Sequence, residues 1–320
     1  MLLKLVIWLT EMSAPVIALK VDVDTLRGTL EGVPRLQELF SQKQTDATFL
    51  FSLGPDHTGW AIRRVFRRGF LNKVKRTSVL EHYGLKTLLY GTLLPGPDIG
   101  RQAGAVMRKV QSAGFETGIH CWDHVLWQDW VATADFEWTT RQMQKAADRY
   151  MEIFRTSATV HGAAGWQMNH HALRLTRELG FNCCSDSRGT QPFLPVVDGD
   201  VIHVPQFPTT LPTLDELIGI DDIGPENVAD RLLELTETPP ATGHVFTLHA
   251  ELEGMRFLPI LERLLTGWRK QGYDLGALRT LAGVIDPKTL PQHEIMQGTA
   301  SGRSGTLLVQ GRNTGSMPVN

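Results

Sequence analysis

Short apolar segments alternate with helical segments along most of this 320-residue chain, and the alternation constrains the fold more than any other feature. Strands are expected over residues 16–24, 47–52, 115–120, 181–184, 201–204 and 244–249. Helices are expected over residues 31–40, 98–114, 138–154, 169–179 and 259–271. Strand–helix–strand spacing of this kind predicts parallel βαβ units. About six or seven such units indicate an α/β fold that is either a barrel or a doubly wound sheet.

Polar side chains gather where the expected strands end. They are Asp22 with Asp24, His120 with His124, Asp186 with Arg188, and His249 with Glu251. In a (β/α) barrel the active site lies at the carboxyl ends of the strands, where these residues fall. A barrel also fits better than a doubly wound sheet, because no glycine-rich phosphate-binding sequence follows the first strand.

The composition narrows the class of protein. Hydrophobic residues make up 42% of the chain and charged residues 21%, which is typical of a soluble globular protein. The formal net charge of −2 argues against a nucleic-acid-binding protein. Three cysteines, two of them adjacent at Cys183 and Cys184, make no disulfide framework. This cysteine usage favours a reducing, cytoplasmic compartment.

The chain is expected to have three parts. Residues 1–14 are an N-terminal extension whose apolar stretch is too short to span a bilayer. The residues before Met12 are either a membrane anchor or not native, and we expect the second, with Met12 as the true start. Residues 15–290 form the catalytic domain, in which an insertion at about 57–97 interrupts the strand–helix alternation. The composition of residues 291–320 is polar and rich in glycine and serine, so we expect a flexible tail there.

The histidine pair predicts a metal site. His120 and His124 are four residues apart, so on a helix both imidazoles would reach one ion. A catalytic metal normally takes three protein ligands and leaves a position open for water. Asp22 and Asp24 alternate along a strand and therefore share a face. One carboxylate could bind the metal while the other takes a proton from water, which predicts a metal-dependent hydrolase.

These strand ends resemble the motifs of the polysaccharide deacetylase (NodB-like) superfamily, metal-dependent hydrolases that remove acyl groups from sugars on a distorted (β/α)7 barrel. The resemblance implies that Asp22 is the catalytic base and Asp24 a metal ligand. It implies that His120 and His124 complete the ligand set, and that His249, in Leu248-His249, protonates the leaving nitrogen. One divalent cation is implied, and zinc, manganese, cobalt and iron all suit two nitrogens and a carboxylate.

Longer segments narrow the resemblance. Residues 21–29, 31–36, 163–166, 210–213 and 249–254 are similar to deformylases within this superfamily, and the likeness covers roughly residues 16 to 304. It implies removal of formate from a formamido sugar carried on undecaprenyl phosphate. The free amino sugar would then serve lipid A modification and resistance to cationic peptides such as polymyxin.

The third motif departs from the superfamily pattern. Many members carry an arginine and a proline there, and the arginine orients the catalytic aspartate. This chain has Ala163, Ala164, Gly165 and Trp166 instead. Either Arg188 takes the orienting role from a neighbouring strand end, or Asp22 is oriented in another way.

Other side chains are candidates for substrate contact, each with a structural alternative. Asp186 and Arg188 either act in the site or pair with each other. Glu251 and its neighbour Glu253 either bind the sugar or solvate a loop. Trp166 either stacks on the sugar or packs in the barrel mouth.

The insertion carries a basic stretch. Residues 61–76 hold seven cations and no acidic residue, with large apolar side chains between them. Such a segment is either a solvated surface helix or an interfacial one. We expect the second, with Arg63, Arg64, Arg67 and Arg68 docking an anionic membrane surface or the lipid phosphate. The enzyme would then be peripheral on the cytoplasmic side of the bacterial inner membrane.

Two other functions compete with this interpretation. The first is an N-deacetylase of peptidoglycan or another glycan, which predicts an exported protein. The second is a non-catalytic, membrane-peripheral carbohydrate-binding protein. Such a protein would be expected to lose the base or the acid, whereas Asp22 and His249 are both present.

Overall fold

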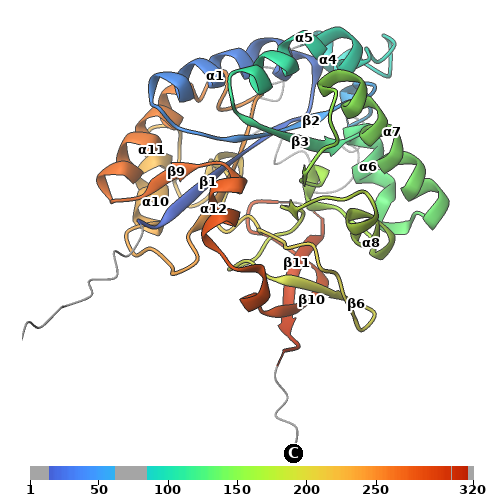
Figure 1. Cartoon of the computed structure of the whole chain (residues 1–320). Helices are drawn as coiled ribbons and strands as arrows, with labels where there is room; N and C mark the ends of the chain where they lie inside the picture. Colours follow the sequence, from blue (N-terminus) through green and yellow to red (C-terminus); the bar gives the residue numbers. More distant parts are fainter. Residues whose placement is uncertain (1–13, 62–84, 304, 316–320) are drawn as a thin grey trace, which may run out of the picture.

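The structure is a computed structural model that describes residues 14–61, 85–303 and 305–315. Its centre is a curled parallel sheet, in which the strand order is β5-β4-β3-β2-β1-β8 and β9 pairs with the start of β1. The strands are β1 (Val16–Val23), β2 (Thr48–Ser52), β3 (Glu116–Cys121), β4 (Val160–His161), β5 (Cys183–Cys184), β8 (His244–His249) and β9 (Asp274–Gly276). Figure 1 shows this sheet in the middle of the molecule with helices around its outer side. The expected α/β barrel is therefore confirmed.

Irregular chain spans the gap between β5 and β8. Cys184 forms a parallel bridge with Gln206, and the Thr210 N–H donates to the Val245 carbonyl at 3.1 Å. Residues 206–210 thus take the place of a full strand, which accounts for the distortion of the barrel.

Most of the helices cover the outside of the sheet, whereas the last one packs through Leu278 and Leu281 against Val16 and Ala18 on its inner face. The helices are α1 (Val33–Gln42), α4 (Leu85–Leu89), α5 (Ile99–Ser112), α6 (His124–Trp130), α7 (Phe136–Phe154), α8 (His170–Glu178), α9 (Leu214–Leu217), α10 (Val228–Leu235), α11 (Leu258–Lys270) and α12 (Leu278–Val284). Side chains of Asp98, Asp135 and Asn169 cap α5, α7 and α8 by accepting backbone N–H groups. No helix in the described ranges combines the length and the apolar character needed to cross a bilayer.

Strand β1 explains why the sheet is central. All eight of its residues are buried, as is typical of a parallel strand covered on both faces. Most are aliphatic, but Lys20 and Asp22 interrupt the apolar run. Both charges are buried, at 0% and 3% exposure, so the interior of the barrel near this strand is polar.

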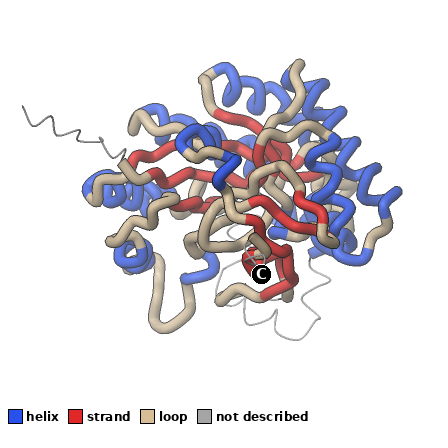
Figure 2. The backbone as a smooth tube through the Cα atoms, turned by 60° about the horizontal axis from the view of Figure 1, so that its bottom comes forward, coloured by secondary structure: helices blue, strands red, loops and turns tan. Residues whose placement is uncertain are grey.

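The C-terminal region differs from the expected flexible tail. Strands β10 (Gln292–Gly298) and β11 (Leu307–Asn313) pair antiparallel and join β6 (Leu194–Val197) and β7 (Asp200–Val201) in a second sheet. Figure 1 shows this sheet below the barrel, and Figure 2 brings it forward. Leu307 and Leu308 are each 2% exposed. The prediction was wrong for these residues, because two buried leucines anchor a segment that is otherwise largely polar. The expected strand at 201–204 also shrinks to the short β7.

The insertion leaves and rejoins the barrel at one point. Pro55 and Asp98 form an antiparallel bridge, and the Asp56 N–H donates to the Pro97 carbonyl at 2.9 Å. Its four membrane-docking candidates, Arg63, Arg64, Arg67 and Arg68, lie outside the described residues, as do residues 1–13 of the expected extension.

Candidate active site

Three predicted metal ligands meet at the carboxyl ends of β1 and β3. Asp24 Oδ1 lies 3.2 Å from His120 Nε2 and 3.3 Å from His124 Nε2. The two histidines do not share a helix as first expected, since His120 belongs to β3 and His124 begins α6. Asp123 fixes that junction, because its side chain caps α6 by accepting the Leu126 N–H.

The donor atoms suit a divalent cation. His120 Nδ1 lies 2.6 Å from the Gly162 carbonyl, to which it donates, so the Nε2 lone pair faces Asp24. Asp24 Oδ1 is buried and has no hydrogen-bond partner among the described residues. Two ligands at about 2.1 Å from one ion stand roughly 3.0–3.4 Å apart at octahedral or tetrahedral angles, close to the separations here. A cation would relieve the juxtaposition of lone pairs, so these residues fit the metal that the sequence implies.

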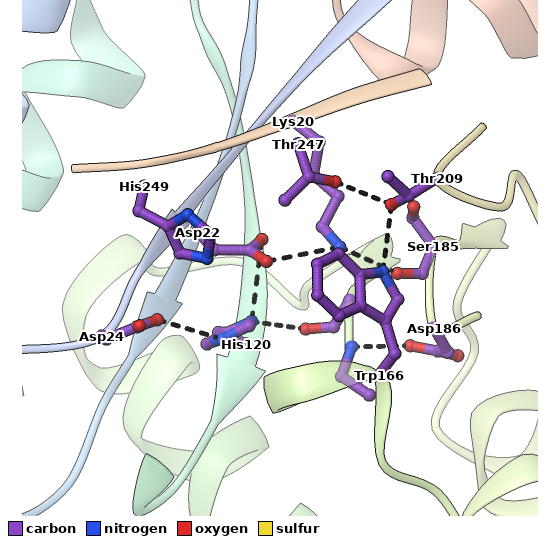
Figure 3. Close-up of polar contacts among 12 residues, drawn as sticks. Lys20, Asp22, Asp24, His120, Trp166, Ser185, Asp186, Thr209, Thr247 and His249 are labelled. Carbon is purple, nitrogen blue, oxygen red and sulfur yellow. Dashed lines mark hydrogen bonds and ion pairs between the residues drawn. The ribbon is translucent and has the colours of Figure 1, made fainter. Parts of the chain in front are cut away.

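Asp22 lies beside these three candidate ligands, and Lys20 contacts its carboxylate. Lys20 Nζ is 3.4 Å from Asp22 Oδ2 and donates to the Ser185 carbonyl at 3.1 Å (Figure 3). The other oxygen, Asp22 Oδ1, is buried without a hydrogen-bond partner in the described ranges and lies 3.8 Å from His120 Nδ1. Asp22 therefore presents one unoccupied oxygen on the side of the candidate metal site.

His249 faces Asp22 across two neighbouring strands. The two residues are partners in the register of β1 and β8, and the Ala250 N–H donates to the Asp22 carbonyl. The His249 N–H donates to Glu253 Oε2 at 2.7 Å. Burial disfavours the imidazolium, but nearby carboxylates, chiefly Asp215, outweigh it and raise the pKa of His249. The raised pKa suits a group that delivers a proton.

Glu251 holds the end of β1 and is not placed to contact sugar. It is 1% exposed, and its Oε1 accepts the N–H groups of Asp24 and Thr25 and the Thr25 hydroxyl, at 2.8–3.1 Å. Burial, followed by the charge of Asp24, raises the pKa of Glu251 to about 8. The structure thus argues against the predicted sugar contact and gives Glu251 a supporting role.

Asp186 is likewise a supporting residue. It is 0% exposed and accepts hydrogen bonds from the Ala163 N–H and the Gln206 amide, while His161 Nδ1 lies 2.6 Å from its Oδ1. With Cys184, the His161 and Asp186 side chains also group as potential metal ligands. Burial, with the charge of Asp186 beside it, raises the pKa of the Cys184 thiol well above its usual range. Without a metal ion the Cys184 thiol is therefore held in its protonated form.

Arg188 does not pair with Asp186, and it does not orient Asp22. Its guanidinium binds both carboxylate oxygens of Glu216, at 2.7 and 2.8 Å. It also lies 5.1 Å from the ring centre of Trp166, which is 1% exposed. Trp166 is thus buried packing in this structure, and Arg188 is fixed by Glu216, so the predicted sugar contacts of both are not supported.

Two histidines outside the predicted site contact carboxylates close to it. His57 Nδ1 lies 2.5 Å from Asp123 Oδ2, behind the α6 cap, and His161 binds Asp186. Lys20 was also missed, although a detectable signal exists. It alternates with Asp22 and Asp24 along β1, so the three side chains share one face of the strand.

Curated relatives of this chain are named as deformylases. The chain is 33% identical over 297 residues to "Probable 4-deoxy-4-formamido-L-arabinose-phosphoundecaprenol deformylase ArnD" of Shewanella sediminis, covering 91% of this chain and 93% of that protein. A protein of the same name from Wigglesworthia glossinidia brevipalpis is 31% identical over 284 residues, covering 88% and 98% of the two chains. No family model matches the chain.

A solved structure supports the fold. A Mycobacterium smegmatis protein assigned to the polysaccharide deacetylases superposes with a TM-score of 0.58 and 14% identity, covering 90% of this chain and 99% of that one. At this identity the similarity shows the fold alone. The distorted barrel of the polysaccharide deacetylase type is therefore confirmed.

Proposed function

This chain belongs to the family of 4-deoxy-4-formamido-L-arabinose-phosphoundecaprenol deformylases, and on that premise we propose that it hydrolyses the formamide of this lipid-linked sugar. The products are formate and the free 4-amino sugar on its undecaprenyl phosphate carrier. We place this reaction in the lipid A modification that confers resistance to polymyxin and other cationic peptides.

One observation carries the proposal. Asp24, His120 and His124 converge on one point, and a candidate base and a candidate acid stand beside them on neighbouring strands. A divalent cation bound by these three residues would supply Lewis acidity and lower the pKa of water. Most of this cluster is buried, while the His124 side chain is 19% exposed, so substrate would enter on the His124 side.

Asp22 and His249 divide the proton transfers. Asp22 accepts a proton as water attacks the formyl carbon, and its buried, unoccupied Oδ1 is the atom available for it. Breaking the carbon–nitrogen bond requires a proton on the departing amine, and His249 supplies it. The raised pKa of His249 favours the protonated imidazolium that this step needs.

We further propose that the basic insertion brings the enzyme to its lipid substrate at the cytoplasmic face of the inner membrane. Arg63, Arg64, Arg67 and Arg68 would bind anionic headgroups or the substrate phosphate, each adding on the order of 1 kcal/mol. His57, at the base of the insertion, binds Asp123, which lies between the two candidate metal-ligand histidines in the sequence, so the insertion starts close to the site.

Liposome binding tests the role of the insertion. Replacing all four arginines by glutamine should release the protein from anionic vesicles and raise KM for the lipid substrate. Hydrolysis of a short, water-soluble formamido sugar should be spared. Unchanged co-sedimentation with the vesicles would leave the insertion as an ordinary surface segment.

Formate release tests the reaction. Protein loaded in turn with Mn²⁺, Co²⁺, Zn²⁺ or Fe²⁺ is incubated with the formamido-arabinose lipid, and formate is measured beside an Asp22→Asn control. Formate from the parent protein alone is the expected result. Acetate release from N-acetylated glycans without formate release would instead favour the glycan deacetylase. Binding of the lipid without any turnover would favour the non-catalytic alternative.

A further inference from the structure

We infer that Lys20 is the positioning residue for Asp22, holding one oxygen of that carboxylate so that the other faces the attacking water. The inference rests on the proposed function and adds a residue to its catalytic apparatus. The lysine is 0% exposed, which is rare for this residue type, and its ammonium has two close oxygen partners, Asp22 Oδ2 and the Ser185 carbonyl.

The surroundings of Lys20 leave the ammonium little freedom. The aliphatic part of the Lys20 side chain packs over Gly162. A Cβ at position 162 would stand 3.3 Å from the lysine Cε and would also clash with Leu50. The Trp166 ring lies over the ammonium, with its centre 5.0 Å from Nζ. On the next strand its register partner is Thr247 (Figure 3). The side chain is therefore directed along β1 toward Asp22.

Two other charged residues near Lys20, Asp186 and Arg188, are paired with other groups. Asp186 attracts Lys20, but its oxygens are already occupied by His161, Ala163 and Gln206. The Arg188 guanidinium is bound to Glu216. Asp22 is thus the carboxylate in direct contact with the lysine, at 3.4 Å.

The energetic balance points to a functional reason for the lysine. An unpaired ammonium in a protein interior is strongly unfavourable, and even a buried ion pair is often no more stable than apolar side chains of the same volume. Burial does lower the pKa of Lys20, with Asp22 and Asp186 opposing the shift. A buried cation at this position is therefore poorly explained by stability and well explained by the need to fix Asp22.

Fixing one oxygen has a chemical consequence. A carboxylate can rotate and present either oxygen, whereas a contact from Lys20 to Oδ2 leaves Oδ1 as the proton acceptor. Lys20 also balances the negative charge of Asp22 in the interior. This is the other means of orientation that the sequence left open when it offered Arg188 as one choice.

The first test removes the ammonium and keeps the apolar stem. Lys20→Met should lower kcat by about 10- to 100-fold, as expected for groups that orient catalytic residues. KM for the lipid and the metal content per protein should stay at parent values, because Lys20 is fully buried and its ammonium contacts Asp22 and the Ser185 carbonyl rather than a candidate metal ligand. Thr247→Ser is the control, since it trims one methyl group in the same layer while keeping the Lys20 charge and the hydroxyl that pairs with Thr209, and it should keep a rate close to the parent's.

The second test distinguishes a role of Lys20 in positioning Asp22 from a general loss of structure. It does not depend on the Lys20→Met variant alone. The double variant, with both Lys20→Met and Asp22→Asn, is compared with Asp22→Asn alone. If Lys20 acts through Asp22, adding Lys20→Met should cause no further loss of rate. A further loss in the Asp22→Asn background, or parent kcat in an active Lys20→Met enzyme, would overturn the inference alone. A parent protein that releases no formate would overturn the proposed function, and this inference with it.

Discussion

Glu251 accepts the backbone N–H of Asp24 at 3.1 Å, across 227 residues of sequence. The contact ties the loop after β8 to the end of β1, and two further hydrogen bonds from Thr25 strengthen it. The position of a candidate metal ligand is therefore set by a carboxyl group that does not itself join the ligand set. Gly28 allows this arrangement, because a Cβ there would stand 1.9 Å from Glu251 Oε1.

Gly28→Ala should consequently weaken both folding and metal binding. The added methyl group would displace Glu251, at a cost of about 1–3 kcal/mol in the free energy of unfolding. Thermal unfolding and metal titration measure the two effects. Gly283→Ala is the matched control, because its Cβ would meet nothing within 4 Å on the exposed side of α12. Equal behaviour of the two variants would contradict the role given to Gly28.

Glu253 should make stability depend on pH. Burial raises its pKa to about 7 from the ordinary 4.5, although His249 pulls the value down. The folded protein therefore favours the protonated acid. The stability it contributes is complete below pH 4.5 and is lost as the pH rises toward 7, by roughly 1–3 kcal/mol.

The glutamine variant removes that titration. Glu253→Gln keeps an oxygen for the His249 N–H, so its Tm should fall less than the parent's between pH 5 and pH 8. Parallel pH profiles of Tm in the two proteins would show that Glu253 does not titrate in this window.

The C-terminal sheet should contribute to global stability. Leu308 on β11 is 2% exposed and packs in the main core, so Leu308→Ala should cost about 2–5 kcal/mol of unfolding free energy. Met296 on β10 is 49% exposed, and Met296→Ala should change it by no more than about 0.5 kcal/mol. Denaturant unfolding compares them. Equal, small effects would restore the expectation of a loose tail.

Residues at the strand ends were the predictable part of the site. The alternation of expected strands and helices placed Asp22, Asp24, His120 and His249 at the carboxyl ends of strands. Parallel pairing of the strands brings these ends together. What the sequence did not predict is which buried polar groups serve each other. Glu251 and Asp24 are 227 residues apart in the sequence, and no local sequence pattern predicts a contact between residues so far apart.

The missed features have physical causes as well. Lys20 was treated as an isolated charge in an apolar strand. Its partner Asp22 is recognised only when the residues on one face of β1 are considered together. The second sheet was missed because β10 pairs with β6, about 100 residues earlier, as well as with β11, and the largely polar composition of the segment is typical of a half-exposed sheet. Composition alone does not distinguish such strands from a flexible tail.

The division of labour between Asp22 and Asp24 is tested most directly by measuring metal content and formate release in Asp22→Asn and Asp24→Asn side by side. Asp24 Oδ1 lies 3.2–3.3 Å from both histidine nitrogens, so Asp24→Asn should lose both metal and activity, as should His124→Ala. Asp22→Asn should retain a full complement of metal while kcat falls by roughly 10²–10⁴-fold. Metal retained in Asp24→Asn and lost in Asp22→Asn would contradict the account.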